Sequence, residues 1–158
     1  MQTRLFADYF QILVLDEASE TSLGQAWNDG TLRDRIVALR DVLGIRTEVN
    51  VDVEVDVEWS TEPPRLDAER FDHVAEASVE ISSGRMVVMG NSDHLPDAHR
   101  VEVIPGWVRI RAQKSNLRNA VAADIESDES PETIERIRID AWPAGPSGVD
   151  VVKRWQSE

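Results

Sequence analysis

The segment from Glu48 to Trp59 alternates strictly between polar and apolar side chains. One parity holds five valines and a tryptophan, and the other holds five carboxylates and one asparagine. Successive side chains of a strand point to opposite faces, so a strand would place every valine on one face. A helix would scatter the same valines around its axis, and a strand buried on both faces would need a continuous apolar run. The segment therefore predicts an antiparallel strand that is buried on one face only.

Patterns of period two, separated by turn residues, recur along the rest of the chain. Further strands are expected within residues 5–15, 34–40, 73–82, 85–89, 100–104, 107–113, 134–142 and 149–155, and another is expected to begin near Ile45. One short helix is expected over residues 115–122, with Ser115 as its cap. The chain is therefore predicted to be all-β, as an antiparallel sandwich of two sheets with about eight strands and one short helix. We expect a single domain over residues 1–158, and a closed barrel is the alternative.

The composition limits the classes of function. The 158 residues include 30 acidic and 17 basic side chains, which gives a net charge of −13. Nucleic acids and anionic membranes need a basic surface, so this charge argues against both as direct partners. There is no cysteine, which excludes disulfides and a cysteine nucleophile. The N-terminus lacks the pattern of a signal peptide, and the 15 arginines against 2 lysines favour a GC-rich bacterial genome. We expect a cytoplasmic bacterial protein.

Several segments together carry a resemblance to a known family. An aromatic strand with Tyr9-Phe10-Gln11 precedes a hairpin turned by Ser83-Gly84, and the segments 96–103 (PDAHRVEV) and 105–111 (PGWVRIR) follow. In this order, over residues 5–142, the chain resembles small bacterial β-sandwich proteins related to the competence-associated nuclease inhibitor ComJ. The resemblance implies a sandwich fold and a non-enzymatic acidic protein that binds and silences a nuclease.

The carboxylates of the alternating strand form the first candidate site. Carboxylates two residues apart on a strand lie about 6.5–7 Å apart, which is of the same order as the spacing of DNA phosphates. Such a row would mimic a phosphate backbone and attract a basic protein. Residues 41–100 contain 14 acidic and 5 basic side chains, so local bases cannot neutralise them. The alternatives are cross-strand pairing with arginines at positions 109, 111, 136 and 138, or a solvated face.

Two tryptophans are candidates for the same interface. Trp107 and Trp142 have the outward parity of their strands, and exposed aromatic residues beside arginine are typical of protein interfaces. The alternative is that each covers the end of a sheet beneath a loop. The predicted partner-binding residues are Glu48, Asp52, Glu54, Asp56, Glu58, Trp107 and Trp142.

The loop from Asp93 to His99 (DHLPDAH) holds two imidazoles and two carboxylates, which are competent ligands for a transition metal. Pro96 argues against a helix that would align the two histidines, and the alternative is a polar loop. No Gly-x-Ser-x-Gly motif, phosphate-binding loop or dinucleotide fingerprint occurs. We therefore predict a protein that is not an enzyme, has no cofactor and binds a basic protein, as a nuclease inhibitor or immunity protein. The alternatives are a small-ligand or metal-binding β-domain and a self-associating β-module that forms a homodimer.

Overall fold

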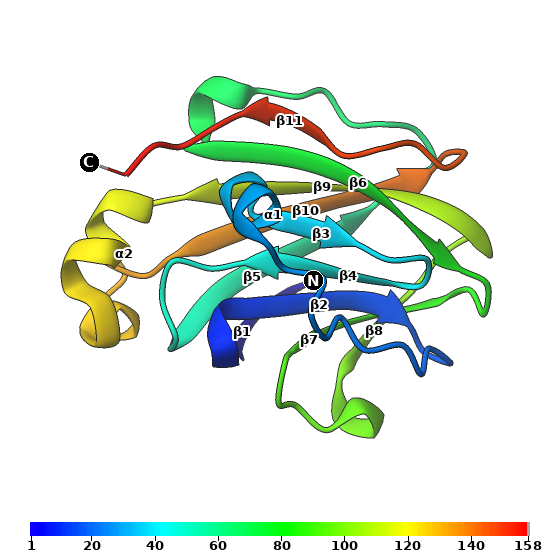
Figure 1. Cartoon of the computed structure of the whole chain (residues 1–158), viewed down its shortest axis with the longest axis horizontal. Coiled ribbons are helices and arrows are strands. Elements are labelled where there is room, and N and C mark those ends of the chain that lie inside the picture. The colour runs from blue at the N-terminus through cyan, green and yellow to red at the C-terminus, as the bar shows by residue number, and fades with distance from the viewer. Residues whose placement is uncertain (158) are drawn as a thin grey trace.

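The computed structural model describes residues 1–157 and consists mainly of strands in two sheets (Figure 1). Residue 158, the last of the predicted domain, lies outside the described residues. Sheet A has six strands, which in spatial order are β1 (Gln2–Phe6), β5 (Asp52–Trp59), β10 (Arg136–Pro143), β9 (Gly106–Ser115), β6 (His73–Ile81) and β11 (Asp150–Lys153). Sheet B has five strands, which in spatial order are β3 (Ile36–Ala38), β4 (Val42–Arg46), β2 (Gln11–Asp16), β7 (Arg85–Gly90) and β8 (His99–Glu102).

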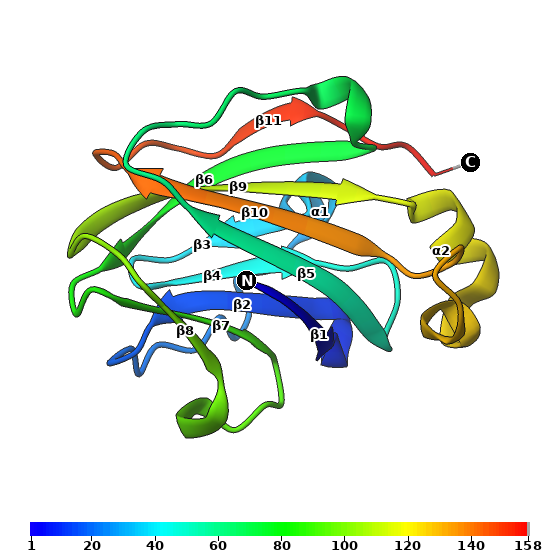
Figure 2. The same ribbon diagram turned by 180° about the vertical axis from the view of Figure 1, so that it is seen from behind.

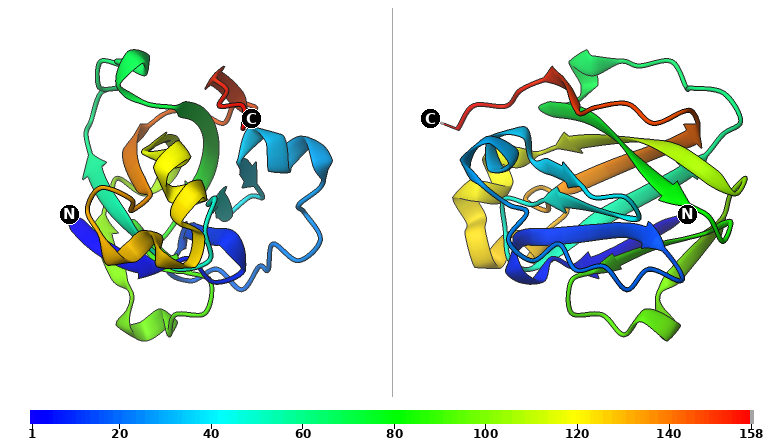
Figure 3. Two further views of the ribbon diagram at one scale, coloured as in Figure 1. Left: turned by 90° about the vertical axis from the view of Figure 1, so that its left-hand side faces the viewer. Right: turned by 45° about the vertical axis from the view of Figure 1, so that its right-hand side comes forward.

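The helices are short and lie between the strands. The α-helices are α1 (Asp29–Asp34) and α2 (Leu117–Ala123), and the 3-10 helices are η1 (Asp8–Phe10), η2 (Ala68–Arg70), η3 (Leu95–Asp97) and η4 (Asp124–Glu129). Helices α2 and η4 follow each other at one end of the molecule, in front in the left view of Figure 3. Helix α2 corresponds to the predicted helix, whereas α1 was not predicted. Within residues 1–157, no helix has the length and apolar composition needed to cross a membrane.

Residues from both sheets form the larger of two hydrophobic clusters in the described part of the chain. Val53, Val55 and Val57 of β5 are at most 2% exposed and belong to the same cluster as Ile12 and Val14 of β2. Full burial of such a side chain stabilises the fold by about 1.5–3 kcal/mol. The predicted one-sided burial of the alternating segment is therefore confirmed.

The predicted all-antiparallel pairing is wrong, because β5 and β10 run parallel, with Arg136 opposite Glu54. Parallel neighbours need a long connection, and residues 60–135 supply it, with four other strands among them (Figure 2). Residues 1–157 contain eleven strands instead of about eight, partly because η1 divides the segment 5–15 into two strands.

The predicted hairpin is also wrong. Strands β6 and β7 flank Ser83-Gly84, but β6 pairs within sheet A and β7 within sheet B. Gly84 has a φ of +75°, a backbone conformation that favours glycine. The turn therefore transfers the chain from one sheet to the other instead of pairing its flanking strands.

Candidate functional site

The outer face of sheet A carries the predicted row of carboxylates. Asp52, Glu54 and Asp56 are half-buried there, and Glu58 is exposed. Strand β5 lies between β1 and β10, so a partner could reach the row only from the outer face of sheet A and could not pair with β5 as an edge strand. Among the described ion pairs, none involves Asp52 or Glu58, the two ends of the row.

Arginines of β10 neutralise the centre of the row. Arg136 Nε donates to Glu54 Oε2 at 3.2 Å, and Arg138 Nη1 donates to Asp56 Oδ2 at 3.3 Å. The parallel register of β5 and β10 places these residues directly opposite each other. Cross-strand pairs of opposite charge stabilise a sheet by about 0.2–1 kcal/mol each. Two ion pairs therefore neutralise the negative charge at the centre of the row.

Glu48 lies apart from the row, in the connection between β4 and β5. Its Oε2 accepts hydrogen bonds from Lys114 Nζ at 2.5 Å and from Arg35 Nε at 3.1 Å. Burial raises the pKa of the Glu48 carboxyl, but these two cations outweigh burial and hold the pKa below its ordinary value. The predicted place of Glu48 in the row is wrong, because the regular strand begins only at Asp52.

Lys114 is fully buried and lies at the centre of a network of buried charges. Its Nζ donates to the Arg46 carbonyl oxygen at 2.6 Å and lies 3.4 Å from Glu135 Oε2, which has no hydrogen bond. Glu135 is also fully buried, and its Oε1 accepts a hydrogen bond from the Glu48 backbone N–H at 2.8 Å. Burial raises the pKa of the Glu135 carboxyl. The network thus joins β9 to the segments that precede β5 and β10.

His73 connects the C-terminal segment to the same region. Its Nε2 lies 2.7 Å from the Asp34 carbonyl oxygen, and its Nδ1 accepts a hydrogen bond from the Trp155 backbone N–H at 3.1 Å. These contacts select the neutral tautomer that carries its proton on Nε2. Burial lowers the pKa of His73 to about 4. Sequence reasoning missed both His73 and Lys114, although each shares the parity of the buried residues in its strand.

The two candidate tryptophans differ in accessibility. Trp142 is only 6% exposed, because the Arg111 guanidinium stacks 4.8 Å from the centre of its ring. Arg111 is held in turn by a hydrogen bond from its Nη1 to the Pro64 carbonyl oxygen at 2.8 Å. The predicted exposure of Trp142 is therefore wrong. Trp107 is half-buried and lies opposite Glu80 of β6.

The loop considered as an alternative metal site, from Asp93 to His99, has its polar groups directed to different partners. His94 Nδ1 lies 3.2 Å from Asp97 Oδ2, and His99 Nε2 lies 3.1 Å from Thr3 Oγ1. Asp93 accepts a hydrogen bond from the Gly90 backbone N–H. Within residues 1–157, no three His, Asp or Glu side chains converge as a metal site would require.

Carboxylates without ion pairs gather in η4. Residues 124–129 (DIESDE) include four carboxylates, and none of them forms an ion pair with another of the described residues. Asp128 Oδ2 accepts a hydrogen bond from the Asp52 backbone N–H at 3.3 Å, and the Asp128 carbonyl oxygen accepts one from Arg4 Nη1 at 3.2 Å. These contacts place η4 beside the start of β5.

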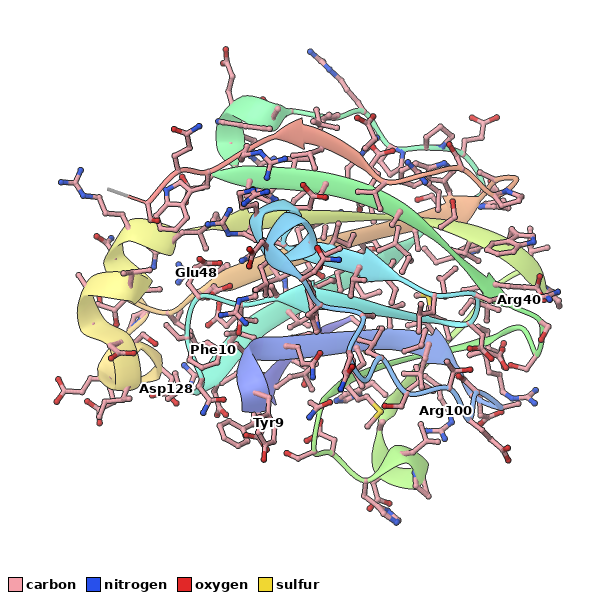
Figure 4. All side chains as sticks on the ribbon, in the orientation of Figure 1. Tyr9, Phe10, Arg40, Glu48, Arg100 and Asp128 are labelled. Atoms are coloured by element: carbon pink, nitrogen blue, oxygen red, sulfur yellow. The ribbon has the colours of Figure 1, made fainter. Side chains whose placement is uncertain are left out.

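Exposed apolar side chains accompany these carboxylates. Ile125 is 72% exposed and Tyr9 is 73% exposed. Tyr9 lies at the same end of the molecule as Asp128 (Figure 4), and its φ of 55° is a strained backbone conformation for an aromatic residue. We call residues 124–129, Asp52 and Tyr9 the acidic end. Apolar side chains among polar ones are the usual anatomy of a protein interface.

Comparisons with known proteins relate the chain by fold. No family model and no curated protein matches the sequence. The solved structure of ComJ from Bacillus subtilis, an inhibitor of the DNA degrading activity of NucA, is similar with a TM-score of 0.67 and 11% identity, over 91% of this chain and 96% of ComJ. The product of crocagin biosynthetic gene J is similar with a TM-score of 0.59 and 18% identity, over 90% of this chain and 95% of that one. The chain therefore shares its fold with both proteins over nearly its whole length.

Proposed function

We propose that this chain is a non-enzymatic protein that binds a basic nuclease and inhibits it. It acts as a single domain in the bacterial cytoplasm. The observation that carries the proposal is the fold shared with ComJ, which inhibits the DNA degrading activity of NucA. The likeness extends over 96% of ComJ, so the proposed function does not depend on a domain that this chain lacks.

The distribution of charge supports a basic partner. The net charge of −13 attracts cations over long range, and such steering increases the rate of association with a basic protein. Ion pairs neutralise Glu54 and Asp56, whereas the carboxylates of η4 and that of Asp52 have no cationic partner among the described residues. We therefore place the contact with the partner at the acidic end.

The chemistry of inhibition follows from that placement. A nuclease binds phosphates in a basic cleft, and carboxylates can occupy the same positions without offering a bond to cleave. Exposed Ile125 and Tyr9 add apolar contact area, which resists dissociation more than peripheral charges do. Glu58 and Trp107, on the outer face of sheet A, would extend the interface only if the partner is large enough to reach them.

The test begins with affinity capture from a lysate of the source bacterium at low and at high salt, followed by affinity measurements with the purified captured protein. The test variant reverses three exposed carboxylates of η4, as Asp124→Lys, Glu126→Lys and Glu129→Lys. The matched control reverses three exposed carboxylates of the connection 60–72, as Glu62→Lys, Asp67→Lys and Glu69→Lys. Both variants change the net charge equally.

We expect capture of a basic nuclease at low salt and its release at high salt, because salt screens exposed charges. We also expect the η4 variant to bind roughly tenfold more weakly or worse, and the control to bind within a few-fold of the original protein. Equal weakening by both variants would place the contact elsewhere. Capture of no nuclease at either salt concentration would contradict the proposed function.

A further inference from the structure

A groove of about 570 Å³ lies on the outer face of sheet A, between β1, β5, β10 and the segment 70–71. In the β-sheet register, Arg4 and Arg136 lie on either side of Glu54, on the two strands that flank β5. The next row places Arg138 beside Asp56. The charged side chains that line the groove are Arg4, Arg70, Arg136, Arg138, Glu54 and Asp56.

Arginines outnumber carboxylates in this groove by four to two. A guanidinium remains charged at every physiological pH, so the lining carries a surplus of two positive charges. In the chain as a whole, the 30 acidic residues outnumber the 17 basic ones. The groove is therefore a positively charged region on a protein whose net charge is negative.

Hydrogen bonds to neighbouring residues hold the guanidinium groups of Arg136 and Arg138 in place. Arg136 donates to Glu54 and to the Pro131 carbonyl oxygen, and Arg138 donates to Asp56 and Asp140. Each guanidinium has five N–H donors, so both keep donors that these contacts do not use. The two side chains are 39% and 40% exposed, which leaves them accessible to a ligand.

The other two arginines are less constrained. Arg70 is exposed, forms no ion pair with another described residue, and lies with its guanidinium carbon 5.8 Å from the centre of the Phe71 ring. Among the described residues, Arg4 donates only to the Asp128 carbonyl oxygen, which does not neutralise its charge. Phe71 also lines the groove and offers an apolar surface beside the guanidinium groups.

We propose that this groove binds a small molecule that carries a doubly charged anionic group, either a phosphate or a dicarboxylate. Guanidinium groups recognise both by paired N–H···O hydrogen bonds, and two negative charges match the surplus of two positive charges. The volume of about 570 Å³ lies within the range of small-molecule sites. The groove adjoins the acidic end at Arg4, but this inference does not depend on the proposed inhibition of a nuclease.

The charge around the groove argues against a long polyanion. A nucleic acid bound across the groove would extend toward η4, because Arg4 at its edge contacts Asp128. The four carboxylates of η4 would repel the next phosphates. A compact dianion avoids this repulsion, since its charge ends within the groove.

The test is a titration of the full-length protein, followed by NMR of the backbone amides and the arginine Nε–H groups. The probes are phenyl phosphate, succinate and a short single-stranded DNA, with sodium chloride at matched ionic strength as the blank. The test variants are Arg70→Gln and the double variant Arg4→Gln/Arg70→Gln, which remove charge without breaking an ion pair. The matched control is Arg65→Gln, an exposed arginine of the same connection that does not line the groove.

We expect saturable shifts of the Arg136 and Arg138 side chains with phenyl phosphate or with succinate, and the tighter of the two identifies the ligand class. Arg70→Gln should weaken this binding roughly tenfold and the double variant should abolish it, whereas Arg65→Gln should leave it unchanged. The proposal is overturned if neither anion gives saturable shifts, if the double variant binds as well as the original protein, or if DNA binds more tightly than both.

Discussion

Replacing Lys114 with methionine tests the buried charged network. The side chain is fully buried, and its ammonium group donates to the Arg46 carbonyl oxygen at 2.6 Å and to Glu48 at 2.5 Å, and forms an ion pair with Glu135 at 3.4 Å. Methionine keeps most of the volume but none of the charge. The variant therefore leaves two carboxylates in the interior that have lost their shared cation.

The expected cost is about 3–5 kcal/mol, the usual penalty when one partner of a buried ion pair is removed. Glu48 keeps Arg35 at 3.1 Å, whereas Glu135 has no other cation among the described ion pairs. The penalty should therefore come mainly from Glu135. Changing Glu135 to glutamine in the Lys114→Met background removes that charge and should recover about half of the loss.

The assay is urea unfolding at neutral pH, followed by tryptophan fluorescence and circular dichroism. The original protein, both single variants and the double variant complete a thermodynamic cycle. The reasoning is refuted if Lys114→Met costs less than about 1 kcal/mol, or if its cost is the same with Glu135 and with glutamine at position 135.

Three further predictions concern stability. Burial lowers the pKa of His73 from 6.5 to about 4, so between these pH values the unfolded chain binds a proton that the folded chain does not. The free energy of unfolding should therefore fall by about 3 kcal/mol as the pH decreases through this range. In urea unfolding at several pH values, His73→Asn should show a weaker dependence of this free energy on pH. Gly90→Ala would place a Cβ 2.2 Å from the Phe6 carbonyl oxygen, and thermal unfolding should show a loss of about 1–3 kcal/mol. Glu54→Gln should cost less than about 1 kcal/mol in urea unfolding, because Glu54 and Arg136 are 41% and 39% exposed; a larger loss would show that this ion pair contributes more than a surface pair.

The burial of individual faces could be predicted from the sequence, but the pairing of strands could not. Val53 and Val55 point inward because side chains alternate along any strand, whatever the direction of its neighbour. The same alternation is compatible with a parallel or an antiparallel partner, so it could not reveal the parallel pair of β5 and β10. That pairing depends on how the 76 residues from position 60 to position 135 fold between the two strands.

The candidate site was predictable to a similar extent. Strand parity identified Arg136 and Arg138 as alternatives to a free acidic row, and the structure pairs both with β5. Parity also gave Trp142 an outward position, but it could not show that Arg111 stacks on its ring. The buried network could not be predicted, because only tertiary packing brings its charged groups together from four separate segments of the chain.

The most direct test of the central claim is DNA degradation by the captured nuclease, measured while this protein is added from below to above an equimolar amount. The account predicts that DNA degradation stops near one equivalent of this protein at low salt. The variant with reversed charges at 124, 126 and 129 should need a large excess to stop degradation, whereas the variant with reversed charges at 62, 67 and 69 should act like the original protein. Degradation that continues unchanged in a large excess of the original protein would contradict it.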